Sequence, residues 1–71
     1  MLILAARERE IAGDRFIEGC RGPGRTRLIG VATPESERLA IQTLAQDGYR
    51  DLWLRQWDEP KQQYAYARKV G

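Results

Sequence analysis

The chain of 71 residues contains no histidine and only one cysteine, Cys20. A single cysteine cannot form an internal disulfide, and without histidine the chain lacks a principal zinc ligand and the commonest general acid or base. A lone cysteine is also more typical of a reducing compartment than of secretion. We therefore expect a non-enzymatic protein with no cofactor, no metal site and no catalytic residues.

Long apolar runs are missing as well. Residues 1–6 are apolar, but the charged residues 7–10 follow at once. This run is too short for the apolar region of a signal peptide and far too short to cross a bilayer. The sequence predicts a soluble, cytoplasmic protein that does not bind a membrane.

The short length leaves room for one domain, covering residues 1–71. A domain of this size buries only about 60% of the surface that its unfolded chain exposes, so its stability is marginal. Small domains usually gain support from disulfides, metals or oligomerisation, and the first two are excluded here. We therefore expect a homodimer.

Residues 34–47 give the clearest secondary-structure signal, that of an amphipathic helix. Thr33 suits the N-cap and Pro34 the first helical position. Gly48 is expected to end the helix, with Tyr49 folding back on its last turn. The apolar stripe at helical spacing consists of Ala40, Ile41, Leu44 and Ala45. We expect Ile41 and Leu44 to be buried and Leu39, which lies off the stripe, to be partly exposed.

The rest of the chain contains segments typical of strands: residues 2–6, 15–20, 26–32, 51–57 and 62–70. Turn-forming residues at 21–25 and 58–61 would connect two hairpins. The sequence thus predicts an α+β fold, with a single antiparallel sheet of four or five strands and one helix packed on one face. The order is βββαββ or ββαββ.

Five of the six aromatic residues fall between residues 49 and 66, and four of them belong to the C-terminal hairpin. Centring its turn on Glu59 and Pro60 predicts a register in which Trp53 faces Tyr66 and Arg55 faces Tyr64. One face then carries six candidate partner-binding residues: Trp53, Arg55, Trp57, Tyr64, Tyr66 and Arg68. The other face, with Leu52, Leu54, Ala65 and Ala67, is expected to lie against the helix.

One helix can cover only one face of the sheet, so the aromatic and arginine face is left outward. Its composition is typical of protein interfaces. Bases that stack on aromatic rings while arginines hold phosphates would use the same residue types. A third possibility is that a dimer mate or the N-terminal segment covers this face.

Arginine also accumulates around the first turn, at Arg21, Arg25 and Arg27. Its planar guanidinium suits forked contacts with phosphates and carboxylates. These residues either contact phosphate or an acidic partner, or form a solvated hairpin tip.

Three segments resemble the carbon storage regulator family of dimeric RNA-binding proteins: residues 1–4 (Met-Leu-Ile-Leu), 11–14 (Ile-Ala-Gly-Asp) and 29–35 (Ile-Gly-Val-Ala-Thr-Pro-Glu). That family has no tryptophan-rich hairpin after its helix, which disfavours this relationship. A strand entering a capped helix and then a hairpin, residues 28–44 and 52–67, resembles small phage-encoded proteins such as anti-CRISPR inhibitors. That resemblance implies a stoichiometric inhibitor that occludes a protein-docking or nucleic-acid-binding surface.

Our leading hypothesis is a small regulator or inhibitor, of the anti-CRISPR type and encoded by a phage, that occludes a surface of a protein or nucleoprotein partner. The alternative is RNA or single-stranded DNA binding through the aromatic and arginine face. A structural dimer, whose extra apolar face is only its own interface, is the third.

Overall fold

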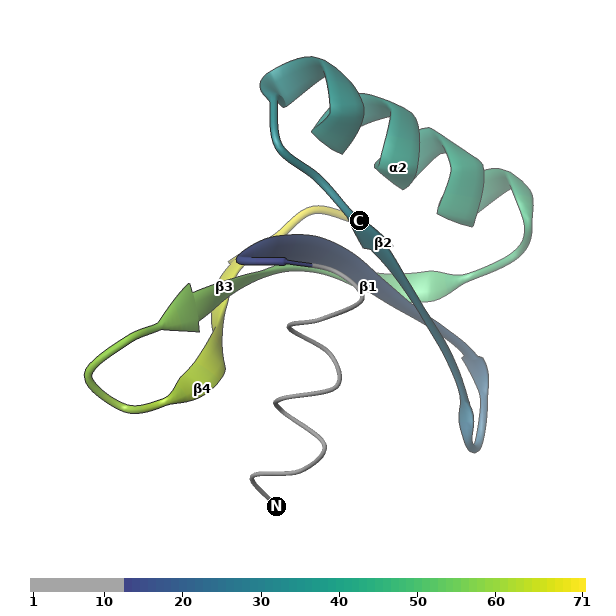
Figure 1. Cartoon of the computed structure of the whole chain (residues 1–71). Coiled ribbons are helices and arrows are strands. Elements are labelled where there is room, and N and C mark those ends of the chain that lie inside the picture. Colours follow the sequence, from purple (N-terminus) through teal and green to yellow (C-terminus); the bar gives the residue numbers. More distant parts are fainter. Residues whose placement is uncertain (1–12) are drawn as a thin grey trace.

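The computed structural model describes residues 13–71. In chain order their elements are β1 (Arg15–Gly22), β2 (Arg25–Gly30), α2 (Pro34–Gln46), β3 (Arg50–Asp58) and β4 (Gln63–Lys69). The strands form one antiparallel sheet in the order β2-β1-β3-β4, and α2 lies over one of its faces (Figure 1). The predicted α+β fold is thus confirmed with four strands in the order ββαββ. The strand predicted at residues 2–6 lies outside the described residues.

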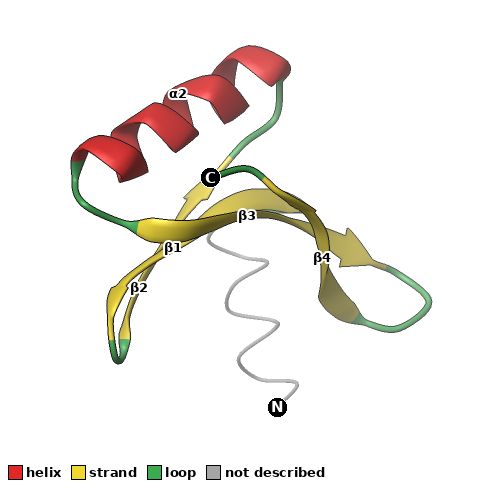
Figure 2. Cartoon of the chain, turned by 180° about the vertical axis from the view of Figure 1, so that it is seen from behind, coloured by secondary structure: helices red, strands yellow, loops and turns green. Residues whose placement is uncertain are grey.

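Two hairpins build the sheet, and α2 connects them. The first turn contains Pro23 and Gly24, as the sequence predicts, and Gly24 has a φ of +71°, which glycine adopts without steric cost. The turns of the two hairpins lie at opposite ends of the molecule (Figure 2). Within residues 13–71, no helix has the length and apolar character needed to span a membrane.

Both ends of α2 follow the predicted signals. The Thr33 Oγ1 accepts a hydrogen bond from Ser36 N at 3.1 Å, and Ser36 Oγ accepts one from Thr33 N at 2.9 Å, which together form a capping box. At the other end Gly48 has a φ of +84°. Gly48 N and Tyr49 N donate to the carbonyls of Ala45 and Leu44, at 3.1 and 3.0 Å, in the Schellman pattern.

The main core lies between α2 and the sheet. Its buried residues are Ile17, Val31, Ala40, Leu44, Leu52 and Leu54. The predicted inward orientation of Leu52 and Leu54 is therefore confirmed, and so is the burial of Leu44. Ile41 is only half-buried, contrary to prediction, because Ala40 and Leu44 form the line closest to the sheet and Ile41 lies at its margin. Leu39 is 47% exposed, as predicted.

The predicted register of the C-terminal hairpin is wrong by two residues. Arg55 pairs with Tyr66, and Trp57 with Tyr64, because the connection is a four-residue loop that brings Asp58 opposite Gln63. Gln62 in this loop has a φ of +53°, and its N–H donates to Glu59 O at 3.2 Å. A shift of two residues leaves each of these side chains on its predicted face.

A bulge then changes the face of one predicted residue. The β3–β4 register shifts by a further residue between Leu54 and Arg55, so Leu54 pairs with Arg68. Arg68 therefore lies on the α2 side of the sheet and not with the aromatic residues, because the extra residue in β4 reverses the alternation beyond it.

Candidate functional site

The face of the sheet opposite α2 gathers aromatic side chains from three strands. We call it the aromatic face, and its residues are Phe16, Glu18, Leu28, Trp53, Arg55, Trp57, Tyr64 and Tyr66. Alternation along the strands explains the set, because Ile17 and Leu54 point toward α2 and their neighbours Phe16 and Arg55 must point the other way. Five of the six predicted partner-binding residues therefore share this face.

The rings on this face pack edge to face. The ring centroids of Phe16 and Tyr64 are 4.7 Å apart, those of Trp57 and Tyr64 are 5.0 Å apart, and both pairs are T-shaped. The hydroxyl of Tyr64 donates a hydrogen bond to Gly13 O. Trp53 and Tyr66 form a second T-shaped pair at 5.3 Å. Such pairs add roughly 0.5–1.5 kcal/mol beyond the area they bury, so the rings are held in fixed positions.

Arg55 links the two ring clusters. Its guanidinium lies 3.7 Å from the centroid of the Tyr66 ring, and its Nη2 donates to Tyr64 O at 2.9 Å. Its Nη1 lies 3.0 and 3.2 Å from the two carboxylate oxygens of Glu18, and only 14% of the Arg55 side chain is exposed. Arg55 is thus neutralised within the chain, and a phosphate could bind it only by displacing Glu18.

Exposure varies across the aromatic face. Phe16 and Tyr64 are buried, Trp53 and Trp57 are half-buried, and Tyr66 is 60% exposed. The Trp57 indole N–H donates to Glu59 Oε1 at 2.8 Å, while Trp53 lies beneath the ammonium group of Lys69 at 5.6 Å. Tyr66, beside Trp53, is therefore the most accessible large side chain of this face.

Arg68, the sixth predicted residue, belongs to a different cluster. It forms an ion pair with Glu37 of α2, which also pairs with Arg15 at 3.3 Å. Both arginines approach the first turn of the helix, where Glu37 is itself favourably placed. Arg68 therefore helps to attach β4 to α2 and does not contribute to the aromatic face.

The arginines of the first hairpin also lie on the α2 side. Arg27 pairs with Asp47 at 2.9 Å, and Arg21 lies 5.4 Å from the centroid of the Tyr49 ring. Arg25, two positions from Arg27 along β2, is exposed and makes no ion pair within residues 13–71. Arg21 and Arg27 place positive charge near the C-terminal end of α2, where it favours the helix dipole.

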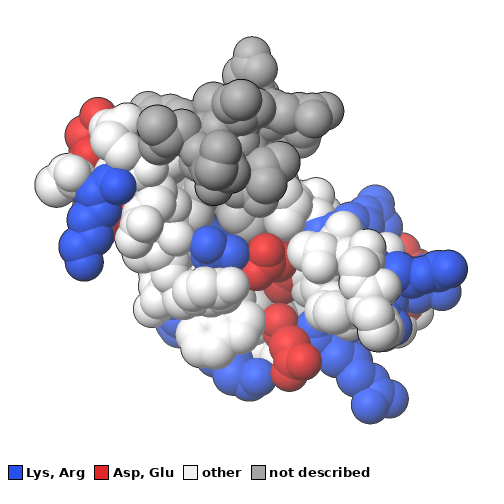
Figure 3. Space-filling view, turned by 90° about the horizontal axis from the view of Figure 1, so that it is seen from below, with Lys and Arg blue, Asp and Glu red and all other residues white. Residues whose placement is uncertain are grey.

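The two predicted sets are thus kept apart by the sheet. The aromatic residues lie on one face, whereas Arg21, Arg25 and Arg27 lie on the other, near the turn at the opposite end from Trp57. In the visible part of the aromatic face, acidic and basic atoms adjoin one another and do not form one basic patch (Figure 3).

Three residues of the aromatic face are not among the predicted partner-binding residues: Phe16, Glu18 and Leu28. The signal is the alternation of β1, in which Phe16 and Glu18 alternate with Ile17 and Gly19, and Leu28 of β2 lies opposite Glu18. Since Glu18 is the countercharge of Arg55, it changes the electrostatics of the whole face.

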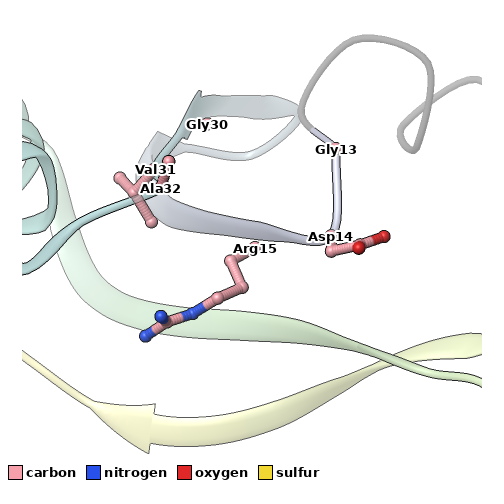
Figure 4. Close-up of a pocket in the computed structure, with 6 residues that line it drawn as sticks. All are labelled: Gly13, Asp14, Arg15, Gly30, Val31 and Ala32. Atoms are coloured by element: carbon pink, nitrogen blue, oxygen red, sulfur yellow. The ribbon is translucent and has the colours of Figure 1, made fainter.

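A shallow pocket of about 420 Å³ lies where β1 begins and β2 ends. Its six lining residues are Gly13, Asp14, Arg15, Gly30, Val31 and Ala32 (Figure 4). The side chains of Asp14 and Arg15 point in different directions, and Arg15 reaches away toward Glu37. The described residues contain no group of acidic or cysteine side chains that could hold a metal ion, and Cys20 donates to Gly22 O at 3.3 Å. The pocket thus brings together no pair of groups for catalysis.

No family model, curated protein or solved structure matches this chain. The resemblances to anti-CRISPR inhibitors and to carbon storage regulators therefore stay predictions, and the aromatic face itself is the basis for inferring a function.

Proposed function

We propose that this chain is a non-enzymatic regulator or inhibitor that binds a protein partner through the aromatic face. The observation that carries the proposal is the exposure of Tyr66, at 60%, on a face whose other rings are already fixed by packing. Partner binding would bury the Tyr66 ring together with the half-buried Trp53.

Pre-organisation of this face supports a role in binding. Tyrosine, tryptophan and arginine are the residues most enriched among those that dominate protein-interface energetics. Arg55, stacked on Tyr66 and paired with Glu18, restricts the rotation of the tyrosine ring before any partner arrives. Ordering a mobile side chain costs roughly 0.5–1.5 kcal/mol, and a fixed ring avoids part of that cost.

Charge favours a protein over a nucleic acid. Proteins that bind single strands combine stacking rings with a positively charged groove along the same path. Here Arg55 is neutralised by Glu18, and Arg21, Arg25 and Arg27 lie across the sheet from the rings. Within residues 13–71, the cation nearest these rings is Lys69, which lies over Trp53 and is already paired with Asp51 at 3.4 Å. A strand stacked on Tyr66 would therefore find few cations of the described residues for its phosphates.

Occlusion is the mode of action that we propose. A partner surface seated on the aromatic face would be closed to other ligands, as the resemblance to anti-CRISPR inhibitors implies. A second copy of the chain is the other occupant that the face could take, which is why the oligomeric state belongs in the test.

The test is affinity capture from the native host, with and without nuclease, using the wild-type chain and two variants. Tyr66→Ala removes the exposed ring, whereas Arg25→Glu reverses an exposed charge on the other face. We expect a protein that is recovered after nuclease treatment, is lost with Tyr66→Ala and is retained with Arg25→Glu.

Light scattering of the purified chain completes the experiment. The proposal would be overturned if nuclease treatment abolishes recovery of the partner. It would also be overturned if Arg25→Glu abolishes recovery and Tyr66→Ala does not. A dimer that Tyr66→Ala converts to a monomer would assign the face to self-association instead.

A further inference from the structure

β2 forms one open edge of the sheet. Val31 N donates to Arg15 O at 3.0 Å, so the odd-numbered residues of this segment turn their backbone groups toward β1. Because the direction alternates in an antiparallel pair, the N–H and C=O groups of Thr26, Leu28 and Gly30 point away from β1. Among the described residues no strand pairs with this edge.

The other open edge, along β4, is protected. A bulge interrupts β4 between Tyr66 and Arg68, and the outward carbonyl of Tyr64 already accepts a hydrogen bond from Arg55. Bulges are a common means of preventing strand addition at a sheet edge, and a carbonyl that already accepts a hydrogen bond is less available to a new strand. In β2 the register with β1 is regular from Thr26 to Gly30, and the strand contains no proline. β2 is therefore the edge better suited to accept another strand.

The side chains of β2 indicate the chemistry of such a strand. Arg25 and Arg27 lie on the α2 side, whereas Leu28 packs against the Phe16 and Tyr64 cluster on the other side. A strand added beside β2 would place alternate side chains next to these two surfaces. Carboxylates would suit the arginine side and apolar groups the Leu28 side.

We propose that the β2 edge binds an extended segment of an acidic partner, in which carboxylate and apolar residues alternate. Backbone hydrogen bonds to residues 26, 28 and 30 would supply affinity. Arg25, which is exposed and makes no ion pair within residues 13–71, would select the acidic side chains, whereas Arg27 is already paired with Asp47. This surface differs from the aromatic face, so the proposal can be tested independently of the proposed function.

The test is an NMR titration of the isotope-labelled full chain at low salt. The probe is a short synthetic peptide in which glutamate and valine alternate, and the control peptide has lysine in place of each glutamate. We expect the Thr26, Leu28 and Gly30 amides to shift and to exchange more slowly with the glutamate peptide, at concentrations up to about 1 mM. The lysine peptide is expected to leave them unchanged.

Two matched variants test the mechanism. Thr26→Pro removes an outward N–H without touching the β1–β2 bonds, and should weaken binding about fivefold relative to Thr26→Val, which keeps that N–H. Arg25→Glu should weaken binding of the glutamate peptide about two- to fivefold and allow the lysine peptide to bind. Tyr66→Ala should have no effect, which separates this edge from the aromatic face.

Several results would overturn the proposal. One is the absence of any shift with the glutamate peptide at about 1 mM, a concentration at which even weak complexes are populated. Another is equal binding by Thr26→Pro and Thr26→Val. The same amides could also shift in the absence of peptide when the protein concentration is raised. That result would assign the edge to a second copy of the chain.

Discussion

Among single residues, Gly19 shows how tightly side chains pack against β1 on the α2 side of the sheet. A Cβ atom at this position would lie 2.6 Å from Leu52 Cδ2 and 3.0 Å from Tyr49 Cβ. Gly19→Ala is therefore expected to destabilise the fold by about 1–3 kcal/mol, because the neighbours must shift. Urea denaturation gives the free energy of unfolding. Gly22→Ala is the matched control, since nothing lies within 4 Å of its Cβ, and equal losses for the two variants would contradict the packing described.

Glu18 is the residue that makes the aromatic face electrically neutral at its centre. Its carboxylate is 20% exposed and accepts two hydrogen bonds from Arg55. Glu18→Gln leaves a largely buried guanidinium without its countercharge, so we expect a loss of roughly 1.5–3 kcal/mol in the free energy of unfolding.

The control for Glu18 is Glu35→Gln. Glu35 pairs with Arg38 at 2.6 Å, but both side chains are about two-thirds exposed. Surface pairs of this kind contribute roughly 0–1 kcal/mol, so this change should be nearly neutral. A Glu18→Gln loss no larger than that of Glu35→Gln would show that Arg55 is not held as described.

Among the elements, α2 depends on its N-terminal cap. Thr33→Ala removes the acceptor for Ser36 N, and we expect a loss of about 1 kcal/mol in the free energy of unfolding. Thr43→Ala, on the exposed side of the same helix, should be neutral or slightly stabilising because alanine has the higher helix propensity. Urea denaturation followed by circular dichroism compares the two, and a Thr33→Ala effect as small as that of Thr43→Ala would count against the capping box.

The elements differ in how far the sequence predicts them. The helix ends and the Pro23-Gly24 turn depend on residues close together in the chain, and their predictions are confirmed. The predicted register of the β3–β4 hairpin is wrong, because the observed register depends on a positive φ at Gln62 and on a bulge beside Arg68. Glutamine does not by itself indicate a positive φ, and the residues around Arg68 do not by themselves indicate a bulge.

The candidate site was predicted in part for the same reason. An error of two residues in register preserves the face of each side chain, so Trp53, Trp57 and Tyr66 were placed together correctly. The bulge reversed Arg68, and the partnership of Arg55 with Glu18 joins two strands far apart in sequence. Pairings of that kind follow from the sheet order, which hairpin patterns alone do not determine.

For the whole molecule, the central feature is that the sheet separates the rings of the aromatic face from the arginines of the first hairpin. The aromatic face contains an internally neutralised arginine, and the arginines of the first hairpin lie on the α2 side near the C-terminal end of the helix. This arrangement is what favours a protein partner for the aromatic face over a single-stranded nucleic acid.

The most direct test is the affinity of the purified chain for single-stranded RNA and DNA at about 50 mM salt, where electrostatic binding is strong. The measurement compares the wild-type chain with Trp53→Ala and Tyr66→Ala by fluorescence anisotropy. We predict that any binding is weak and that neither substitution changes it, because the rings do not stack on bases. Stacked bases contribute roughly 1–3 kcal/mol each, so a loss of about fivefold or more with either variant would contradict the account.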